Sequence, residues 1–360
     1  MHVLGCSEAD QERRASAKRG TANRAETFRR DGSREENTNG GEITMKAIRL
    51  HRRGGPEQLV YEDAPKPELS PGDALIRVRA TGITPTELTW EETYSNCDGS
   101  ERLPAIPGHE VSGVVESVAD DVSDVSIGAE VYALTSFCRN GGAAEYVAVR
   151  AADLAPKPKT LDHAQAAAVP LSALTVWQAF FDHARLAQGQ RVLIHGAAGG
   201  VGTFAIQIAH WRGAYVIGTA SSKNRDFLLG LGADEVIDYQ QTQFEQVVHN
   251  IDVVLDTIGG DTRERSWQVL KPTGILVSLT GPIPEGEAAA HNRHGLFFIV
   301  EPNREQLGEI AALIDSGAIR PVIAETIPLA RAREAFERGV AGHTRGKLVL
   351  QVAAPERASA

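Results

Sequence analysis

The fold is decided by the stretch Arg191-Val-Leu-Ile-His-Gly-Ala-Ala-Gly-Gly-Val-Gly202, which predicts a short buried strand, a glycine turn and the start of a helix. Glycines let the backbone turn tightly and approach phosphate oxygens, and the first N–H groups of the helix face the anion. Such a pattern is weak alone, but here a strand precedes it and apolar residues at helical period follow it. We therefore expect a dinucleotide site formed by Gly196, Ala198, Gly199, Gly200, Val201 and Gly202.

The loop after the next expected strand carries no carboxylate and reads Ala220-Ser-Ser-Lys-Asn-Arg225. An Asp or Glu there would accept a hydrogen bond from a free 2′-hydroxyl of the adenosine ribose and would repel a 2′-phosphate. Hydroxyls and cations suit a phosphate instead. We therefore expect NADPH rather than NADH, bound by Ser221, Ser222 and Lys223 with Arg225 beside them. The alternative is that Lys223 and Arg225 only begin a solvated helix.

The composition is that of a soluble α/β protein with two domains. The chain has 360 residues, 42% of them hydrophobic, and 35 glycines. A net charge of −10 argues against a nucleic-acid or membrane-surface partner, which a basic face would serve. The most apolar stretch, 166–181, is interrupted by Pro170 and is shorter than the roughly 20 residues that span a bilayer. We therefore expect a small-molecule substrate, with no nucleic acid and no membrane as partner.

The cysteines Cys6, Cys97 and Cys138 are far apart and form no C-x-x-C pair. They predict neither a disulfide framework nor a structural zinc site, and they fit a cytoplasmic location. Residues 1–44 hold eight basic and eight acidic side chains and few aliphatic ones, which predicts a disordered tail. Residues 354–360 are a second, short tail. A natural start at Met45 would make the first tail an upstream extension. A mitochondrial presequence is the competing interpretation, against which the acidic residues count.

Two patterns follow one another along the rest of the chain. Short runs separated by Pro and Gly predict a small antiparallel barrel or sandwich, with strands at Lys46–Leu50, Asp73–Arg79, Glu110–Val118 and Glu130–Ala133. After about residue 160, strands alternate with helices, which predicts a doubly wound parallel sheet with strands near 191–195, 215–219, 235–238, 252–257 and 274–279. Helices are expected at 225–231 and 262–270. The last part should pack back on the first half, through helices at 305–316 and 329–339 and strands at 319–323 and 346–352.

Several motifs, taken in order, resemble the medium-chain dehydrogenase/reductase superfamily and its zinc-free quinone oxidoreductase branch. They are Pro107-Gly-His-Glu-Val-Ser-Gly-Val-Val115, Pro170-Leu-Ser-Ala-Leu-Thr-Val-Trp177, the glycine turn, Leu231-Gly-Ala-Asp-Glu-Val-Ile-Asp-Tyr239, Asp256-Thr-Ile-Gly-Gly260 and Gly346-Lys-Leu-Val-Leu350. The resemblance implies an α/β fold with a Rossmann doubly wound parallel sheet and a GroES-like, mostly-β catalytic domain. The catalytic domain would take residues 45–166 and 305–353, and the Rossmann domain 167–304.

The same resemblance suggests further site residues. Thr175 and Tyr239 match family positions near the pyrophosphate and the adenosine, and Phe298 and Val300 match the segment that flanks the nicotinamide. Thr84 falls where quinone oxidoreductases usually have Asn, and it could hydrogen-bond the nicotinamide ribose or the substrate oxygen. Tyr94 is the phenol candidate for catalysis, with Trp90 as an apolar wall, although Tyr94 could equally be a packing aromatic. Related reductases are commonly homodimers, which we expect here.

The resemblance also raises the question of zinc. His109 falls on a zinc histidine of the related alcohol dehydrogenases, but Thr84 and Ser172 fall where their cysteine ligands would be. Neutral hydroxyls are poor substitutes for thiolates, so we expect no metal. Without a Lewis acid, hydride transfer from NADPH to a quinone or an α,β-unsaturated carbonyl is favoured, because the substrate itself spreads the negative charge. The alternatives are a zinc-dependent alcohol dehydrogenase and a noncatalytic NADPH-binding protein.

Overall fold

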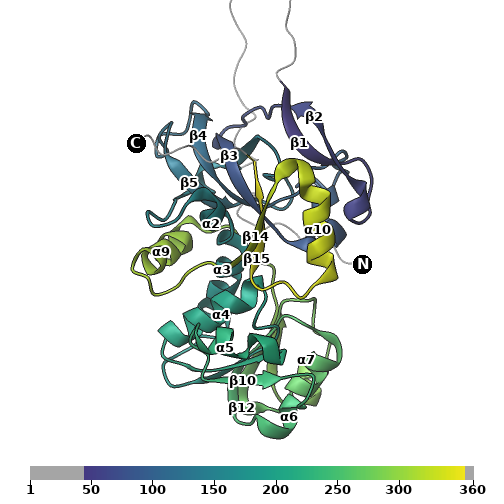
Figure 1. Ribbon diagram of the computed structural model, residues 1–360, viewed down its shortest axis with the longest axis vertical. Coiled ribbons are helices and arrows are strands. Elements are labelled where there is room, and N and C mark those ends of the chain that lie inside the picture. Colours follow the sequence, from purple (N-terminus) through teal and green to yellow (C-terminus); the bar gives the residue numbers. More distant parts are fainter. Residues whose placement is uncertain (1–43, 353–360) are drawn as a thin grey trace, which may run out of the picture. The chain divides into compact units, whose positions relative to one another are not determined.

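The computed structural model describes residues 44–352, which form three β-sheets surrounded by helices (Figure 1). The expected tails lie outside the described residues, except for Thr44, which opens strand β1 (Thr44–Leu50). The sheets have two, six and seven strands. This arrangement confirms the expected α/β class, with a parallel sheet and a second, mostly-β part.

The six-stranded sheet is parallel throughout and has the order β10-β9-β8-β11-β12-β13. Counted along the chain, this is the order 3-2-1-4-5-6 of a dinucleotide-binding fold, whose crevice opens where the order reverses. That point lies between β8, which carries the glycine turn at its end, and β11. The strands are β8 (Arg191–Ile194), β9 (Tyr215–Ala220), β10 (Glu235–Asp238), β11 (Ile251–Asp256), β12 (Leu270–Ser278) and β13 (His294–Phe297).

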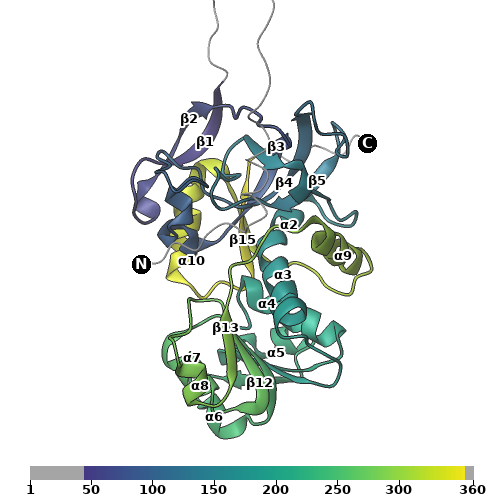
Figure 2. The same cartoon turned by 180° about the vertical axis from the view of Figure 1, so that it is seen from behind.

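Both faces of this sheet are covered, which explains its continuous aliphatic strands. Val192 and Ile194 belong to one apolar cluster and Leu193 to another, because successive side chains point to opposite faces. Helices α3 (Pro170–Trp177) and α4 (Gly200–Trp211) pack together in the first cluster (Figure 2). The second cluster includes Phe244 of α6 (Phe244–Val247) and Trp267, which directly follows α7 (Gly260–Ser266). The remaining α-helices are α2 (His163–Ala167), α5 (Arg225–Leu229), α8 (Glu287–Ala290), α9 (Arg304–Asp315) and α10 (Ala332–Ala341).

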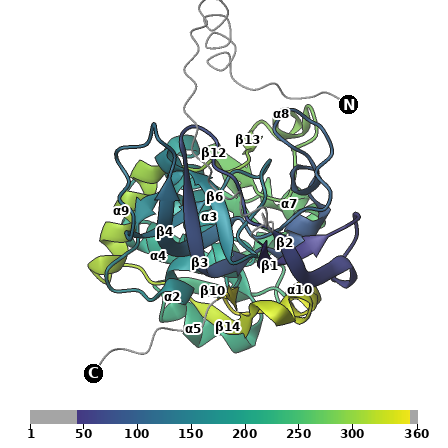
Figure 3. The ribbon, with the colours of Figure 1, turned by 90° about the horizontal axis from the view of Figure 1, so that it is seen from above.

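The seven-stranded sheet combines strands from residues 73–156 with two strands from residues 323–351. Its order is β14-β15-β3-β4-β5-β7, and β6 also pairs with β3 (Figure 3). Only the β14–β15 pair is parallel. β1 and β2 form the separate two-stranded sheet. The strands are β2 (Leu59–Pro65), β3 (Asp73–Ile83), β4 (Glu110–Val118), β5 (Glu130–Leu134), β6 (Tyr146–Arg150), β7 (Ala155–Pro156), β14 (Ile323–Pro328) and β15 (Lys347–Gln351).

One expected strand is displaced. The sequence predicts a strand at 319–323, whereas β14 begins only at Ile323. The reason is that both backbone groups of Arg320 bond to the side chain of Gln207, at 3.0 Å each, and Pro321 has no N–H to donate. Arg320 is therefore hydrogen-bonded to helix α4 instead of to a neighbouring strand.

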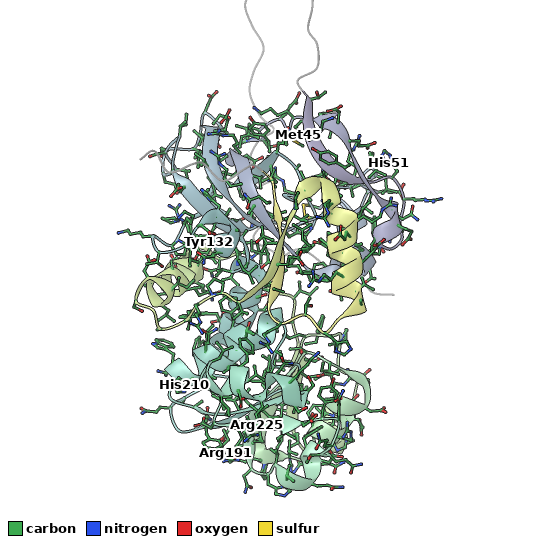
Figure 4. All side chains as sticks on the ribbon, viewed as in Figure 1. Met45, His51, Tyr132, Arg191, His210 and Arg225 are labelled. Atoms are coloured by element: carbon green, nitrogen blue, oxygen red, sulfur yellow. A yellow bond between two sulfur atoms is a disulfide. The ribbon has the colours of Figure 1, made fainter. Side chains whose placement is uncertain are left out.

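Helix α9 follows the six-stranded sheet along the chain and packs on α3 and β7. Its Leu307, Ile310 and Ile314 are buried in the same cluster as Tyr132 of β5. The hydroxyl of Tyr132, labelled in Figure 4, donates to the carbonyl oxygen of Leu307 at 2.6 Å. The helix thus links strands of the mostly-β part to the core of the parallel sheet. Within residues 44–352, no helix has the length and apolar character to cross a membrane.

Candidate active site

The glycine turn links β8 to α4, and two of its glycines are required for space. Gly196 has a φ of +64°, and a Cβ there would lie 2.3 Å from Thr257 Oγ1. A Cβ on Gly202 would lie 2.4 Å from the carbonyl oxygen of Gly196. A side chain at Gly196 would push the turn away from Thr257, and one at Gly202 would force the turn and the helix apart. The turn therefore lies close to the N-terminus of α4, whose unpaired N–H groups can face a phosphate.

A cavity of about 560 Å³ lies beside this turn. It is lined by predicted cofactor residues from three separate segments, namely Gly196, Ala198, Gly199, Ser221, Lys223 and Tyr239. Gly200, Val201 and Gly202 begin α4 and do not line the cavity. The structure thus brings the phosphate turn, the ribose loop and Tyr239 around one space, of a size that suits a small ligand.

The other predicted cofactor residues lie elsewhere. Ser222 lines a neighbouring cavity of about 310 Å³. Thr175 is buried on α3, and its hydroxyl donates to the carbonyl oxygen of Leu171 at 2.7 Å. Phe298 and Val300 follow β13 instead of belonging to it, and Val300 is buried in the apolar core. The cofactor roles of these residues stay predictions.

Arg225 does not lie beside Lys223 as expected. Residues Ser222–Asn224 form one short turn of helix, and Arg225 then opens α5 (Figure 4). Its guanidinium donates to the carbonyl oxygen of Val236 at 3.0 Å and lines the smaller cavity. The turn rotates the side chain toward β10, so Lys223 is the cation that this loop contributes to the larger cavity.

A segment from the end of the chain closes the same cavity. His343 and Thr344 line it, although they lie more than a hundred residues beyond the ribose loop. The neighbouring Arg345 donates to the carbonyl oxygen of Lys223 at 3.2 Å and to Asn224 Oδ1 at 3.0 Å. Sequence reasoning missed these residues. The available signal was a polar loop between two glycines, Gly342-His-Thr-Arg-Gly346, directly before the last strand.

His195 forms a fixed, neutral part of the cavity wall. Its Nδ1 lies 3.1 Å from Thr219 Oγ1 and its Nε2 lies 2.9 Å from Ser266 Oγ. Burial lowers the pKa of His195 to about 3. The ring of Phe244 meets the imidazole edge-on at 4.7 Å between centroids. His195 therefore shapes the cavity and does not exchange protons near neutral pH.

A second group of polar side chains surrounds Thr84, between β3 and the short helix η2 (Pro85–Thr89). The ammonium of Lys347, on β15, donates to the carbonyl oxygen of Ile83 at 3.0 Å and to Thr84 Oγ1 at 3.3 Å. It also forms an ion pair with the carboxylate of Glu110, on β4. The side chains of Lys347 and Glu110 are only 6% and 1% exposed, whereas Thr84 is half-buried. Sequence reasoning missed this pair, although a lysine in an apolar closing strand was a visible signal.

The buried carboxylate is fixed from a third direction. Glu110 Oε1 accepts a hydrogen bond from the backbone N–H of Leu171, at 3.0 Å. Leu171 lies in the first turn of α3, where backbone N–H groups have no partner within the helix. Glu110 therefore joins β4, α3 and β15 at one point.

Aromatic rings form a wall next to this group. The ring of Phe137 meets Trp90 at 5.4 Å and His109 at 5.1 Å between centroids, both edge-on. His109 Nδ1 lies 3.1 Å from Thr135 Oγ1, and among the described residues its Nε2 has no hydrogen-bond partner. Burial lowers the pKa of His109 to about 3, so the imidazole is neutral. The role of Trp90 as an apolar wall of the substrate site stays a prediction.

Tyr94 lies in the core of the mostly-β part and not on the larger cavity. Its hydroxyl donates to the carbonyl oxygen of Leu88 at 2.8 Å, and the guanidinium of Arg53 lies 4.9 Å from its ring centroid. Burial raises the pKa of its phenol above the usual value. A proton-donating role for Tyr94 stays a prediction, and it would require breaking the bond to Leu88.

The expectation of unpaired cysteines is wrong for two of the three. Cys97 and Cys138 form a disulfide, with their Cα atoms 4.9 Å apart. Their separation of 41 residues hid the pair, because the two loops meet only in the fold. Arg102 helps to bring them together, since its guanidinium donates to the carbonyl oxygens of Thr93, at 2.9 Å, and Phe137, at 3.0 Å. Cys6 lies outside the described residues.

The donors near His109 do not fit a catalytic zinc. Thr84 accepts a hydrogen bond from an ammonium, Ser172 offers a buried hydroxyl, and both sulfurs of the nearby loops are in the disulfide. A catalytic zinc takes three strong ligands, of which only one neutral imidazole is present here. Across residues 44–352, no cluster of three His, Cys, Asp or Glu side chains could hold a metal ion.

Comparisons with known proteins agree with this fold. The family model described as "Alcohol dehydrogenase GroES-like domain" matches residues 70–159, and the one described as "Zinc-binding dehydrogenase" matches residues 231–350. The chain is 34% identical over 317 residues to the NADPH-dependent alkenal/one oxidoreductase of Arabidopsis thaliana, covering 85% of this chain and 79% of that protein. It is 31% identical over 333 residues to the quinone oxidoreductase of Mus musculus, covering 86% and 98%.

Another relative is named as a mitochondrial zinc-binding oxidoreductase of Arthroderma benhamiae, 35% identical with 82% of this chain and 92% of that protein covered. Among solved structures, the quinone oxidoreductase of Coxiella burnetii has a TM-score of 0.79 and 33% identity, over 86% of this chain and 100% of that one. The chain therefore belongs to the medium-chain dehydrogenase/reductase superfamily and is quinone oxidoreductase-like. It is an oxidoreductase that uses a nicotinamide cofactor.

Proposed function

We propose that this protein reduces a quinone or an α,β-unsaturated carbonyl compound with NADPH and without a metal. The observation that carries the proposal is the environment of Thr84. An alcohol dehydrogenase needs a thiolate there, but this chain has a hydroxyl that is hydrogen-bonded to the buried ammonium of Lys347. Relatives named as quinone and alkenal/one oxidoreductases support the substrate class.

When bound, NADPH supplies a hydride to the substrate carbon. The chain's own residues bind and orient the reactants. The turn at Gly196–Gly199 and the start of α4 hold the phosphates, while Ser221 and Lys223 meet the adenosine ribose. Thr84 donates a hydrogen bond to the substrate oxygen, where negative charge develops, and Trp90 and Phe137 form an apolar wall.

The preference for NADPH rests on charge in the larger cavity. No Asp or Glu is among the residues that line it, whereas Lys223, Arg265 and His343 are. A 2′-phosphate carries a negative charge that a carboxylate would repel and a cation attracts. The name of the Arabidopsis relative points to the same cofactor.

A panel of quinones, enones and alkenals, each with NADPH and with NADH, tests the proposal. We expect turnover with NADPH for members of at least one of these classes, and weaker turnover with NADH. Metal analysis of the purified protein accompanies the panel. Stoichiometric zinc together with alcohol oxidation would instead support a zinc-dependent alcohol dehydrogenase, and binding of NADPH without any turnover would support a noncatalytic NADPH-binding protein.

A homodimer completes the proposal. Strand β13 is an edge of the six-stranded sheet, because among the described residues only β12 pairs with it. An open edge can pair with its copy about a two-fold axis. Light scattering after gel filtration would measure the mass. A cytoplasmic location stays a prediction. The cysteines no longer support it, because two of them form a disulfide, and several relatives have "mitochondrial" in their names.

A further inference from the structure

We propose that Lys347, held by Glu110, is a positioning residue that fixes the hydroxyl of Thr84 as a hydrogen-bond donor toward the reacting oxygen of the substrate. This inference rests on the proposed reduction of a quinone or enone and adds the residues that orient its donor. None of the sequence motifs assigned a role to Lys347 or to Glu110.

The hydrogen-bond inventory of Lys347 sets the direction of the Thr84 proton. An ammonium carries three N–H donors and no acceptor. Three acceptors surround Lys347 Nζ, namely the carbonyl oxygen of Ile83, the carboxylate of Glu110 and Thr84 Oγ1. Thr84 must therefore accept in this bond, and its own O–H points elsewhere. In the described part of the chain, no protein acceptor receives that proton.

The burial of Lys347 and Glu110 stabilises this orientation of the Thr84 hydroxyl. Lys347 and Glu110 are almost completely removed from water, where hydrogen bonds and charge attraction are stronger. Glu110 cannot swing away easily, because its second oxygen accepts from the N–H of Leu171. Thr84 differs from the pair in being half-buried, so part of this residue stays open to a ligand.

The pair lies between Thr84 and the start of the phosphate-binding helix. A Cβ built on Gly200, the first residue of α4, would lie 2.6 Å from Lys347 Cδ. The same point is 3.5 Å from Ser172 Oγ, a buried hydroxyl that lacks a hydrogen-bond partner among the described residues. The stem of Lys347 thus fills the space that Gly200 leaves open, and its ammonium reaches past the helix to Thr84.

The chemistry requires a donor of this kind. When the hydride and its electron pair join the substrate carbon, conjugation moves negative charge to the substrate oxygen. A hydroxyl whose oxygen already accepts from a cation donates more strongly to that oxygen. Solvent supplies the proton that completes the reduction, while Lys347 and Thr84 keep theirs. The negative charge of Glu110 balances the positive charge of the ammonium. Lys347 therefore acts mainly by fixing the direction of the Thr84 hydroxyl and adds little net charge to the site.

A mutant cycle tests whether Lys347 acts through Thr84. Thr84→Val removes the donor at similar volume. Lys347→Met together with Glu110→Gln removes both charges and leaves no unpaired buried charge. We expect each change to lower kcat for an enone by about 100-fold, with a small change in KM. The triple variant should be no slower than Thr84→Val alone, and Thr84→Ser should recover most of the activity.

Two results would overturn the inference. One is a kcat of the triple variant that falls by the product of the two separate losses, and the other is an unchanged kcat after removal of the charge pair. If the charge-pair variant loses its cooperative melting transition, Lys347→Met alone takes its place in the cycle, because the buried carboxyl of Glu110 can then become neutral by taking up a proton. A wild-type protein that reduces no quinone or enone would contradict the proposed function itself, and this inference with it. Turnover by the wild type with independent effects contradicts the inference alone.

Binding gives a readout without turnover. With NADP⁺ present, 4-nitrophenol offers an oxygen that resembles the charged oxygen of the reduced substrate, and its absorbance reports its ionisation. We expect Thr84→Val and the charge-pair variant each to weaken its binding by about fivefold, and the triple variant to weaken it no further. Equal affinity in all four proteins, or no binding by the wild type, would count against a donor at Thr84.

Discussion

The backbone N–H of Gly346 donates to the carbonyl oxygen of Ala198 at 2.9 Å, so the loop before the last strand is bonded to the glycine turn itself. A bridge between Gly199 and Gly346 continues this contact. The turn that faces the phosphates is therefore supported from two sides, by its own helix and by the far end of the chain.

Lys223→Glu should reverse the cofactor preference. The substitution places a carboxylate in the larger cavity, where it repels a 2′-phosphate and accepts from a free 2′-hydroxyl. We expect the affinity for NADPH to fall by about tenfold or more, with NADH spared or improved. Fluorescence titration of the reduced cofactors measures this. Arg225→Glu is the matched control, because Arg225 lines the smaller cavity, and an equal effect of both changes would refute the assignment.

Gly202→Ala should abolish tight cofactor binding while leaving most of the fold intact. The new Cβ would lie 2.4 Å from the carbonyl oxygen of Gly196, so the turn must move. Titration with NADPH should show a loss of about tenfold or more. Gly308→Ala is the control within helix α9, where a Cβ meets nothing, and it should raise the free energy of unfolding by about 0.5–1 kcal/mol. Normal binding by Gly202→Ala would contradict the tight packing of the turn.

Glu87→Gln should stabilise the protein in alkaline solution. Burial raises the pKa of Glu87 to about 8 from its ordinary value of 4.5. Between these pH values the folded state holds a proton that the unfolded state has lost, so the free energy of unfolding falls as the pH rises. Glutamine can still accept from the N–H of Gly108, which bonds the carboxyl at 3.2 Å, and it has no proton to lose.

The advantage of Glu87→Gln over the wild type should therefore be small at pH 4 and grow up to about pH 8, to at most ~5 kcal/mol. Urea unfolding across this range measures it. A difference that does not change with pH would mean that Glu87 is ionised in the folded protein.

Reduction of the disulfide should lower stability. Cys97 and Cys138 close a loop across 41 residues of sequence, which limits the unfolded chain by about 4 kcal/mol at most. The double variant Cys97→Ser, Cys138→Ser should melt at a lower temperature than the oxidised wild type. Addition of a reductant should lower the melting temperature of the wild type but not of this variant. A reductant effect of equal size in both proteins would point to a cause other than this bond.

Local pattern was sufficient for most of the fold. The strand at Arg191–Ile194, the turn at Gly196–Gly202 and the helix after it each follow from neighbouring residues, because aliphatic runs, glycines and helical period act over short distances. The predicted strand at 319–323 was wrong for a long-range reason, because the side chain of Gln207 forms hydrogen bonds with both backbone groups of Arg320. Such a partner cannot be recognised from the local pattern.

The parts of the site that depend on local motifs were predicted, and the parts that depend on long-range contacts were missed. Residues within the glycine turn and the ribose loop, such as Gly199 and Lys223, line the larger cavity as the motifs predict. The disulfide joins loops that are far apart in sequence. The ion pair of Lys347 with Glu110 likewise joins two strands that are far apart in sequence, and they come together only because β15 and β4 both pair with β3.

The position of β15 has a consequence for synthesis. This strand lies between β14 and β3, its first residue supplies the ammonium near Thr84, and the loop before it closes the cofactor cavity. A nascent chain still attached to the ribosome can build the parallel sheet, yet it lacks this strand until residues 343–351 have left the exit tunnel. The larger cavity and the ammonium beside Thr84 are therefore completed by one and the same segment, which is synthesised after the whole parallel sheet.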